Sequence, residues 1–365
     1  MAEKKTIAFY CSSLTKGGAE RVFANLAEYF TEKGYTVYMV TQYKQEDEYG
    51  LKPGITRILS DITPGEEKNG RIDNFFARFF KLRNIFKKIK PDIVFSCNGK
   101  NNFMAECAGM GLHCKTVVSV VADPKMEYPT KLMCLLAKVL FRFADGIVFQ
   151  TKEAMDFFPK AVRKKGVILP NSLNPQFIRE RFEGEREKEI VAVGRLDDNK
   201  NQAMLLNAFA EIKDDFPDYR VVIYGEGEDR PRLEKLVAER KLDGRVSLPG
   251  RTDKIEEKIY KSSLFVMTSD TEGMPNALIE AMSLGLCVIS TDCPCGGPRE
   301  LITPGKNGYL VPVRDTEALK EQLSYCLSHP EEAEDVGREA ARIQESMAPD
   351  SVNRKWEEYF GKVMG

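Results

Sequence analysis

The sequence predicts an α/β protein of two doubly wound domains, and two observations lead to this fold class. First, strand-like segments alternate with helix-like segments along all 365 residues, a length sufficient for two hydrophobic cores. Second, the strand-like segments are apolar throughout, which is typical of parallel strands buried on both faces. Because such open sheets bind ligands at the carboxyl ends of their strands, we expect two Rossmann-like domains that face each other across a binding cleft.

The first domain is expected over residues 1–172. It begins with a strand at 7–11, a turn at Gly17-Gly18 and a helix at 19–33 that ends at Gly34. Further strands are expected at 36–41, 93–97, 116–121 and 146–151.

The second domain is expected over residues 173–347. Strands are predicted at 190–193, 220–224, 246–248, 264–268 and 287–290, and helices at 202–213, 230–241, 253–261 and 276–284. The remaining segment, 348–365, contains a helical pattern at 351–364 with its aromatic residues on one side. From the pattern alone, this helix caps the second domain.

Composition excludes several classes of protein. The net charge of −1 argues against a generally basic nucleic-acid binder. Residues 1–172 carry 27 Lys and Arg against 18 Asp and Glu, whereas the remainder carries 27 against 37, so only the first domain is expected to meet an anionic surface or substrate. The nine cysteines, an odd number, indicate reduced thiols in a cytosol, and Cys293-Pro294-Cys295 has no second Cys or His pair to complete a metal site. No segment reaches the roughly 18 uncharged apolar residues of a spanning helix, so the protein is expected to be soluble or at most peripheral.

The strongest motif follows the predicted strand 264–268. A glycine turn at Gly273 leads to Pro275, a residue suited to the first position of a helix, and the free amides of a helix start attract anions. Glu272 lies in the turn and Glu280 lies one or two turns into the helix, so both carboxylates can point into the cleft. Carboxylates accept hydrogen bonds only, so beside an anionic ligand they fit neutral hydroxyls, as in a sugar nucleotide. An exposed loop before an ordinary amphipathic helix is the alternative.

Two further motifs lie at strand ends. Gly194, Arg195 and Lys200 follow the strand 190–193, and two cations there can neutralise a diphosphate without a metal. The first domain has Thr15-Lys16-Gly17-Gly18, where paired glycines let the backbone approach a ligand; this is neither a dinucleotide fingerprint nor a P-loop. Solvated cations and a plain tight turn are the respective alternatives. Gly225 marks another strand-end turn, for which contact with a ribose or base and a mere connection are equally open.

In their order, these motifs resemble those of the retaining, nucleotide-sugar-dependent glycosyltransferases of family 4, whose GT-B fold has two Rossmann-like domains. The resemblance covers essentially the whole chain. It implies that Glu272 and Glu280 form the family's Glu-x7-Glu motif, with Glu272 on donor-sugar hydroxyls and Glu280 on the ribose. It further implies that the helix in 348–365 returns to the first domain. Together with the strand-end glycines above, the candidate donor-contacting residues are Gly17, Gly18, Gly194, Arg195, Lys200, Gly225, Glu272, Gly273, Met274, Pro275, Asn276 and Glu280.

One position departs from the family. Many members carry a His at the end of the strand that corresponds to 116–121, whereas this chain reads Val121-Ala122-Asp123. Asp123 is a candidate for positioning an acceptor group, with a turn residue before Pro124 as the alternative. Catalysis does not need the His if the leaving diphosphate itself accepts the acceptor's proton. Arg195, Lys200 and Glu272 are then the expected catalytic residues.

The segment 71–90 combines seven cations with five phenylalanines and a single acidic residue, Asp73. A basic amphipathic helix with aromatic residues fits an anionic membrane surface. A first-domain helix with its phenylalanines in the core is an equal alternative. The candidates for contact with membrane or acceptor are Arg78, Lys81, Arg83, Lys87, Lys88 and Asp123.

Together, these observations predict a glycosyltransferase that moves a sugar, with retention and without a metal, from a UDP-sugar to a glycan or polyprenyl-diphosphate-linked saccharide. The expected role is bacterial cell-surface polysaccharide or glycoconjugate synthesis. The expected location is the cytoplasm, with the inner face of the plasma membrane as a peripheral site. A nucleotide-sugar epimerase and an inactive sugar-nucleotide-binding partner subunit remain alternatives.

Overall fold

The computed structural model describes residues 5–15, 17–63 and 70–365, without the side chain of Arg71. Lys16, part of the glycine motif in the first domain, therefore lies outside the described residues. Contacts divide the chain into two units, Met1–Asn171 with Asp350–Gly365 and Ser172–Pro349. The predicted bounds, 172/173 and 347/348, differ from this division by one and two residues.

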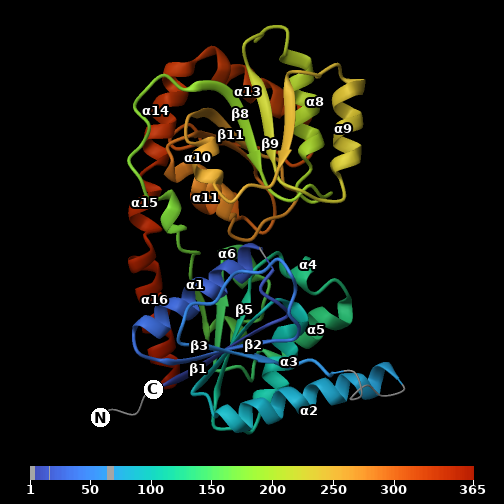
Figure 1. Cartoon of the computed structure of the whole chain (residues 1–365), viewed down its shortest axis with the longest axis vertical. Coiled ribbons are helices and arrows are strands. Elements are labelled where there is room, and N and C mark those ends of the chain that lie inside the picture. Colours follow the sequence, from blue (N-terminus) through green and yellow to red (C-terminus); the bar gives the residue numbers. More distant parts are fainter. Residues whose placement is uncertain (1–4, 16, 64–69) are drawn as a thin grey trace. The chain divides into compact units, whose positions relative to one another are not determined.

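Unit 1 contains a seven-stranded sheet whose strands are all parallel, in the order β3-β2-β1-β4-β5-β6-β7 (Figure 1). The order reverses between β1 and β4, which is the doubly wound arrangement. The strands are β1 (Thr6–Cys11), β2 (Thr36–Thr41), β3 (Ile55–Leu59), β4 (Ile93–Cys97), β5 (Lys115–Val120), β6 (Gly146–Phe149) and β7 (Gly166–Ile168).

Helices cover both faces of this sheet because successive residues of its central strands alternate between two cores. Ile7 and Phe9 of β1 pack with α1 and α16, whereas Ala8 and Tyr10 pack with α2 and α3. The helices of unit 1 are α1 (Gly18–Glu32), α2 (Arg71–Ile89), α3 (Gly99–Gly109), α4 (Pro124–Glu127), α5 (Lys131–Leu140), α6 (Lys152–Asp156), α7 (Lys160–Arg163) and α16 (Pro349–Met364).

The last helix, α16, belongs to the core of unit 1. Phe360 stacks on Phe30 of α1 at 5.2 Å between ring centroids, and Trp356 meets Phe95 of β4 edge-on at 5.2 Å. Burial of these large rings gives α16 most of its stabilisation. The interpretation of this helix as a cap on the second domain, drawn from its pattern alone, is therefore wrong.

Unit 2 repeats the same topology with six parallel strands in the order β10-β9-β8-β11-β12-β13. The order reverses between β8 and β11. The strands are β8 (Glu187–Val193), β9 (Arg220–Tyr224), β10 (Val246–Gly250), β11 (Ser262–Met267), β12 (Cys287–Thr291) and β13 (Tyr309–Val311). Two parallel, doubly wound sheets confirm the predicted fold class.

The helices of unit 2 also form two layers. Leu205 and Phe209 of α8 pack on the face that Ile190 presents, and Leu278 of α11 packs on the face of Val191. The helices are α8 (Gln202–Ile212), α9 (Arg230–Glu239), α10 (Ile255–Ile259), α11 (Asn276–Ser283), α12 (Gly297–Leu301), α13 (Thr316–Ser328), α14 (Pro330–Ala340) and α15 (Ile343–Ser346), with a 3-10 turn at Pro175–Phe177.

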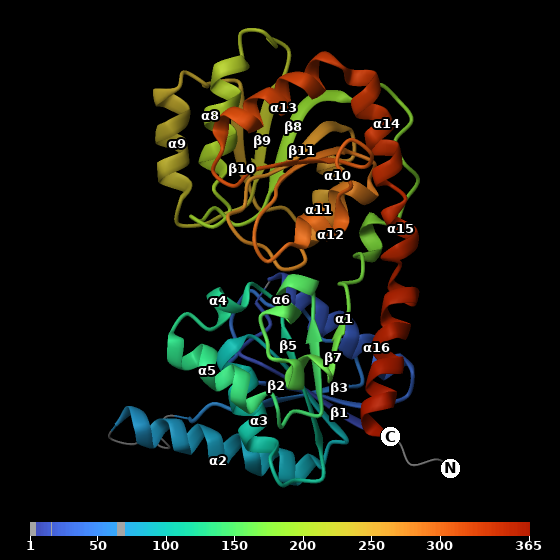
Figure 2. The same ribbon diagram turned by 180° about the vertical axis from the view of Figure 1, so that it is seen from behind.

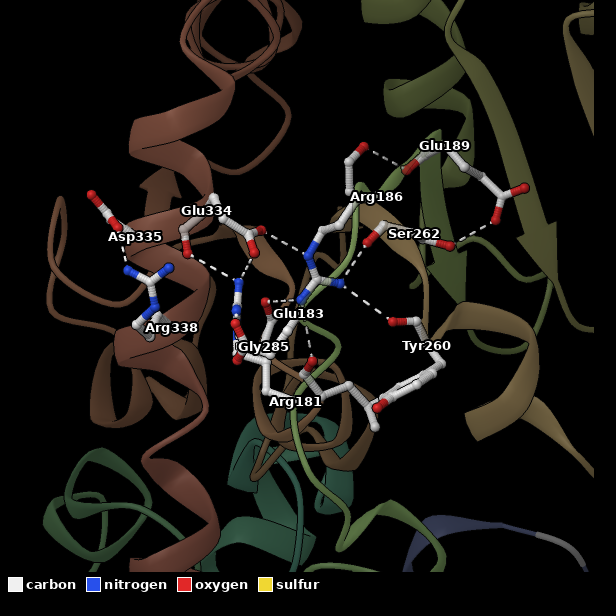
Figure 3. A network of polar contacts seen from close by, with 12 residues as sticks. Arg181, Glu183, Arg186, Glu189, Tyr260, Ser262, Gly285, Glu334, Asp335 and Arg338 are labelled. Carbon is white, nitrogen blue, oxygen red and sulfur yellow. Dashed lines mark hydrogen bonds and ion pairs between the residues drawn. The ribbon is translucent and has the colours of Figure 1, made fainter.

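A buried polar network ties α14 to the amino-terminal side of this sheet (Figure 3). The Glu334 carboxylate accepts hydrogen bonds from Arg181 and from Arg186 Nε, the latter at 2.8 Å. Arg186 also donates to the carbonyl oxygens of Ser262 at 3.0 Å and Gly285 at 2.7 Å. Burial, with the neighbouring Arg181 charge, lowers the pKa of Arg186 to about 10. The single carboxylate of Glu334 thus forms ion pairs with two buried guanidinium groups.

Candidate functional site

The candidate donor site lies where the strand order of unit 2 reverses. The loop after β8 carries Gly194, Arg195 and Lys200, and the loop after neighbouring β11 carries Glu272 and Gly273. Since carboxyl ends of adjacent parallel strands share one edge of the sheet, the topology brings the two motifs together.

Glycines allow the backbones at this edge to touch. Gly194 N donates to the carbonyl oxygen of Tyr224 at 3.0 Å, and Leu196 N donates to that of Glu226 at 3.0 Å. A side chain at Gly225, whose φ is +149°, would overlap the carbonyl oxygen of Gly194, and one at Gly227 would overlap that of Leu196. The absence of a side chain at Gly225 therefore lets the turn after β9 pack directly against the backbone of Gly194.

The two predicted cations have different surroundings. The Arg195 side chain is 71% exposed, and its Nε lies 3.2 Å from Asp197 Oδ2. Lys200 is more enclosed: its amide donates to Asp197 Oδ1 at 3.0 Å, and its carbonyl oxygen accepts from Thr268 Oγ1 at 2.9 Å. Lys200 is thus fixed to β11, while Arg195 is available to solvent.

Asn199 joins the two loops. Its Nδ2 donates to the Thr271 carbonyl oxygen at 3.1 Å, its Oδ1 accepts from Thr271 Oγ1 at 2.9 Å, and its carbonyl oxygen accepts from Asp270 N at 2.7 Å. With the loops fixed in this way, the Lys200 ammonium group forms an ion pair with the Glu272 carboxylate. Two of the three predicted catalytic residues are therefore in direct contact, and Asn199, between Arg195 and Lys200 in the sequence, is a bracing residue that the motif analysis missed.

The turn that leads to α11 is braced from the segment after β12. Glu272 N donates to the Pro294 carbonyl oxygen at 2.8 Å, and Cys295 N donates to the Glu272 carbonyl oxygen at 3.1 Å. A side chain at Gly297 would overlap the Gly273 carbonyl oxygen. Burial, with the nearby Glu272 charge, raises the pKa of the Cys293 thiol to about 12, so this cysteine is an inert packing residue.

Helix α11 begins at Asn276, as the predicted helix 276–284 does. Pro275 has an extended conformation and is the residue before the helix, rather than the first helical residue for which it is suited. Met274 is buried in the core below the sheet edge, whereas Asn276 is half-buried. Glu280 lies in the second turn of α11 and is only 6% exposed.

The first sheet has a second candidate edge where its order reverses. Gly17 is the extended residue before α1, and Gly18 is the first residue of that helix. Arg57 donates to Glu48 at 2.6 Å, and the same carboxylate accepts from Leu14 N, so the pKa of Glu48 falls to about 2. A charged, hydrogen-bonded side chain thus supports the loop that precedes Gly17.

Polar side chains that the sequence analysis did not select gather at this edge. Gln42 Nε2 donates to Asn101 Oδ1 at 2.8 Å and to the Tyr10 hydroxyl at 3.0 Å, and Asn101 Nδ2 donates to Ser12 Oγ at 3.1 Å. Of these residues, only Asn101 had a signal in the sequence, the polar run at 98–102 directly after the strand 93–97. Their amide and hydroxyl groups suit the hydroxyls of a saccharide.

Asp123 and Glu127 lie beyond the neighbouring strand, β5. Asp123 caps α4, with its Oδ1 accepting from Lys125 N at 2.9 Å, which is the turn role considered as its alternative. Glu127 Oε1 accepts from Gly99 N at 3.1 Å. Burial of this carboxyl group outweighs its hydrogen bonds and raises its pKa to about 8. Glu127 is thus a titratable group at the sheet edge that no motif had indicated.

The helix predicted as basic and amphipathic, α2, has phenylalanines both in the core and exposed to solvent. Leu82 and Phe86 are buried in the core, whereas Phe75, Phe76 and Phe80 are exposed. The candidate cations of α2 have different surroundings. Arg78 pairs with Asp61 at 2.6 Å, and Arg83 donates to the carbonyl oxygens of Ala108 and Met110. Lys81 is half-buried, whereas Lys87 and Lys88 are exposed. Arg83 therefore connects α2 to the end of α3, and the exposed phenylalanines lie in the amino-terminal half of α2.

Two features are absent from the described ranges, 5–15, 17–63 and 70–365. No helix there combines the length and apolar character of a membrane span. No cluster of three or more His, Cys, Asp and Glu residues there is placed to hold a metal ion. A hollow of about 260 Å³ in unit 2 is lined by Glu300, Thr303 and Arg342, and none of the predicted donor residues lines it.

Comparison with known proteins covers the whole chain. Residues 16–177 match the family model described as Glycosyltransferase Family 4, and residues 174–343 match Glycosyl transferases group 1. A Campylobacter jejuni protein named GalNAc-alpha-(1->4)-GalNAc-alpha-(1->3)-diNAcBac-PP-undecaprenol alpha-1,4-N-acetyl-D-galactosaminyltransferase is 26% identical over 362 residues, which cover 98% of both chains.

Solved structures share the fold over nearly the full length. A sucrose-phosphate synthase from Thermosynechococcus elongatus has a TM-score of 0.84 at 19% identity, with 99% of each chain covered. The HepE protein of Anabaena, solved with UDP and glucose, has a TM-score of 0.82 at 16% identity, with 98% of this chain and all of that chain covered.

Proposed function

Because this chain is a family-4 glycosyltransferase with the GT-B fold, we propose that it moves a hexose or N-acetylhexosamine, with retention, from a UDP-sugar to a polyprenyl-diphosphate-linked saccharide. The observation that carries the proposal is the ion pair of Lys200 with Glu272, with the exposed Arg195 in the same loop as Lys200, at the edge where the strand order of unit 2 reverses. The expected cell-surface role, polysaccharide or glycoconjugate synthesis, follows from such an acceptor.

The donor is held by complementary charge. The UDP diphosphate lies against Arg195 and Lys200 and competes with Glu272 for the Lys200 ammonium group. Glu272 is thereby freed to accept hydrogen bonds from donor-sugar hydroxyls, and Glu280 accepts from the ribose. No metal is needed in this arrangement because the two cations neutralise the diphosphate. UDP in the HepE structure supports this choice of nucleotide.

The chemical step is a substitution at the anomeric carbon on one face of the sugar. The bond from that carbon to the diphosphate oxygen breaks, and the bond to the acceptor oxygen forms on the same side. The acceptor's proton passes to the leaving diphosphate oxygen, whose negative charge Arg195 and Lys200 stabilise. Positioning and electrostatic stabilisation then supply the catalysis, without a nucleophile or base from the protein.

The acceptor assignment rests on the Campylobacter relative, whose name specifies an undecaprenyl-diphosphate-linked acceptor. A polyprenyl carrier resides in a membrane, so the enzyme works at the cytoplasmic face and meets it peripherally. The exposed phenylalanines and the cations Lys87 and Lys88 of α2 support such a contact with anionic lipid. The polar edge formed by Gln42 and Asn101 is the proposed acceptor side.

A panel of UDP-sugars incubated with polyprenyl-diphosphate-linked oligosaccharide, followed by mass spectrometry, tests the proposal. We expect the acceptor to gain one sugar residue and UDP to be released. An isomerised donor would indicate an epimerase, and binding without turnover would indicate an inactive partner subunit; either result contradicts the proposal. NMR of the new linkage distinguishes retention from inversion.

A further inference from the structure

Helix α5 presents a continuous apolar stripe to solvent. The side chains of Leu132, Leu135, Leu136, Val139 and Phe143 are 40% to 64% exposed. Their spacing of three, four or seven residues places them along one side of the helix and its following turn. Single exposed apolar residues are ordinary, but a full stripe on one helix marks a surface that meets another apolar phase.

The stripe is not a consequence of a loosely held helix. On the opposite side of α5, Ala137 and Phe141 are fully buried. The Phe141 ring packs against Phe103 of α3 and against Tyr128, at centroid distances of 6.0 and 5.9 Å. Thr130 caps the helix by accepting from Met133 N at 3.2 Å. The helix is thus anchored by one apolar face while a second faces outward.

The charges along the stripe all have one sign. Lys131, Lys138 and Arg142 lie within residues 131–143, which contain no acidic residue. Lys131 and Arg142 are exposed, and Lys138 is half-buried with its ammonium group 4.2 Å from the Phe157 ring centroid. Aliphatic side chains flanked by cations are the pattern of a helix that lies in the interfacial layer of an anionic membrane.

Helix α2 lies on the same side of unit 1 as α5. Helix α3 packs against both, and the two views show them there (Figures 1 and 2). Phe143, after α5, and Met110, at the end of α3, are both exposed and line a hollow of about 460 Å³.

We propose that α5 is the insertion element of this enzyme: its stripe of Leu132, Leu135, Leu136, Val139 and Phe143 enters the interface of an anionic phospholipid bilayer. The inference rests on the proposed lipid-linked acceptor and adds the surface through which the first unit is held beside it. In this arrangement α2 contributes aromatic residues and charge, while α5 contributes the aliphatic contact. Acyl chains cover the stripe, and phosphate headgroups neutralise Lys131 and Arg142.

A second copy of the chain fits the stripe less well. In a two-fold dimer the same surface of both copies meets, so the cations beside one stripe would approach those beside the other. No acidic residue in 131–143 is available to compensate for that repulsion. An anionic bilayer supplies both the apolar phase and the opposite charge.

Vesicle flotation of the full chain tests the proposal. We expect the protein to float with phosphatidylcholine vesicles that contain phosphatidylglycerol, and the Leu132→Ser/Leu135→Ser variant to lose roughly tenfold or more in partitioning. Arg142→Glu should reduce binding to anionic vesicles only. Ile178→Ser is the control, since Ile178 is an aliphatic residue of unit 2 whose exposure, 47%, falls within the range of the stripe, and it should bind like the wild type.

A fluorescence measurement reports insertion directly. The chain has a single tryptophan, the buried Trp356, so Leu135→Trp adds one probe on the stripe. We expect a blue shift on vesicle binding and quenching by lipids brominated on the acyl chain, while the parent protein shows neither. An unquenched probe on bound protein would overturn the insertion.

Turnover with a short, water-soluble saccharide acceptor separates this proposal from the proposed function. The α5 variants should retain wild-type turnover there and lose it with the acceptor in vesicles. If they float like the wild type, or if sedimentation velocity shows a dimer that Leu132→Ser/Leu135→Ser dissociates, membrane insertion is wrong. If no variant or parent transfers sugar to the soluble acceptor, the proposed function fails instead.

Discussion

Replacement of Lys200 by methionine is the perturbation that best separates the role of this residue in catalysis from its role in folding. Lys200 pairs with Glu272, and the two side chains are only 22% and 13% exposed. Removal of the ammonium group leaves a largely enclosed carboxylate without its counter-charge, which costs about 1–3 kcal/mol of unfolding free energy. Loss of one preorganised stabiliser of the leaving diphosphate lowers kcat by roughly 10²–10³, equivalent to about 3–4 kcal/mol.

The double variant Lys200→Met/Glu272→Gln distinguishes the two effects. It removes both charges, so no carboxylate is left without its counter-charge. Chemical denaturation should therefore show much of the lost stability restored, because the free-energy effects of substitutions at two residues in contact do not add. Turnover of the UDP-sugar should stay as low as in Lys200→Met. Arg195→Ala, at an exposed side chain, should lower kcat roughly tenfold or more with stability unchanged. Wild-type turnover in both Arg195→Ala and Lys200→Ala would refute the proposed stabilisation of the diphosphate.

Three further predictions concern the framework. The pKa of Glu127 rises from 4.5 to about 8 on folding, so its stabilisation is complete below pH 4.5 and is lost as the pH approaches 8. The free energy of unfolding should fall over that interval by at most about 5 kcal/mol, and Glu127→Gln should flatten this dependence in urea titrations. Glu334→Gln removes the counter-charge of Arg186 and its buried neighbour; we expect a loss of about 3 kcal/mol by the same method, with the UDP affinity of the folded protein retained. Gly225→Ala should displace the Gly194 backbone and lower kcat/KM by about 100-fold, and an unchanged kcat/KM would show that this close approach is unimportant.

The central strands of both sheets could be predicted from the sequence because each is a continuous apolar run between turn residues. The strand at 93–97 coincides with β4 (Ile93–Cys97), and that at 220–224 coincides with β9 (Arg220–Tyr224). The edge strand β10 (Val246–Gly250) was predicted at 246–248, but three other edge strands were missed. Of these, β7 (Gly166–Ile168) and β13 (Tyr309–Val311) have three residues each, and β3 (Ile55–Leu59) is only partly buried. A short or half-buried strand carries too little periodicity to be recognised.

Helix α5 was not given bounds for a different reason. The apolar residues of 131–143 occupy two sides of the helix, so the pattern could not show which of them face the core. The helical pattern of α2 was recognised, but its periodicity could not show that Phe86 is buried while Phe75 is exposed. That difference depends on which part of α2 packs in the core with α3.

The donor site was more accessible to sequence reasoning because its residues follow adjacent strands. Because β8 and β11 are neighbours in the sheet, the loops that follow them meet, and Lys200 contacts Glu272. Glu127 could not be found in this way, because its significance comes from the enclosure of its carboxyl group beside Gly99, a contact between residues 28 positions apart in the sequence.

Isothermal titration calorimetry of UDP against the full chain is the most direct test of the central claim, that fixed cations in the second unit hold a nucleoside diphosphate. We expect one binding site per chain in the wild type, affinity reduced roughly tenfold or more in Arg195→Ala and in Lys200→Met, and no change in Ile178→Ser. The absence of measurable UDP binding by folded wild-type protein would contradict the assignment of the donor site and the mechanism derived from it.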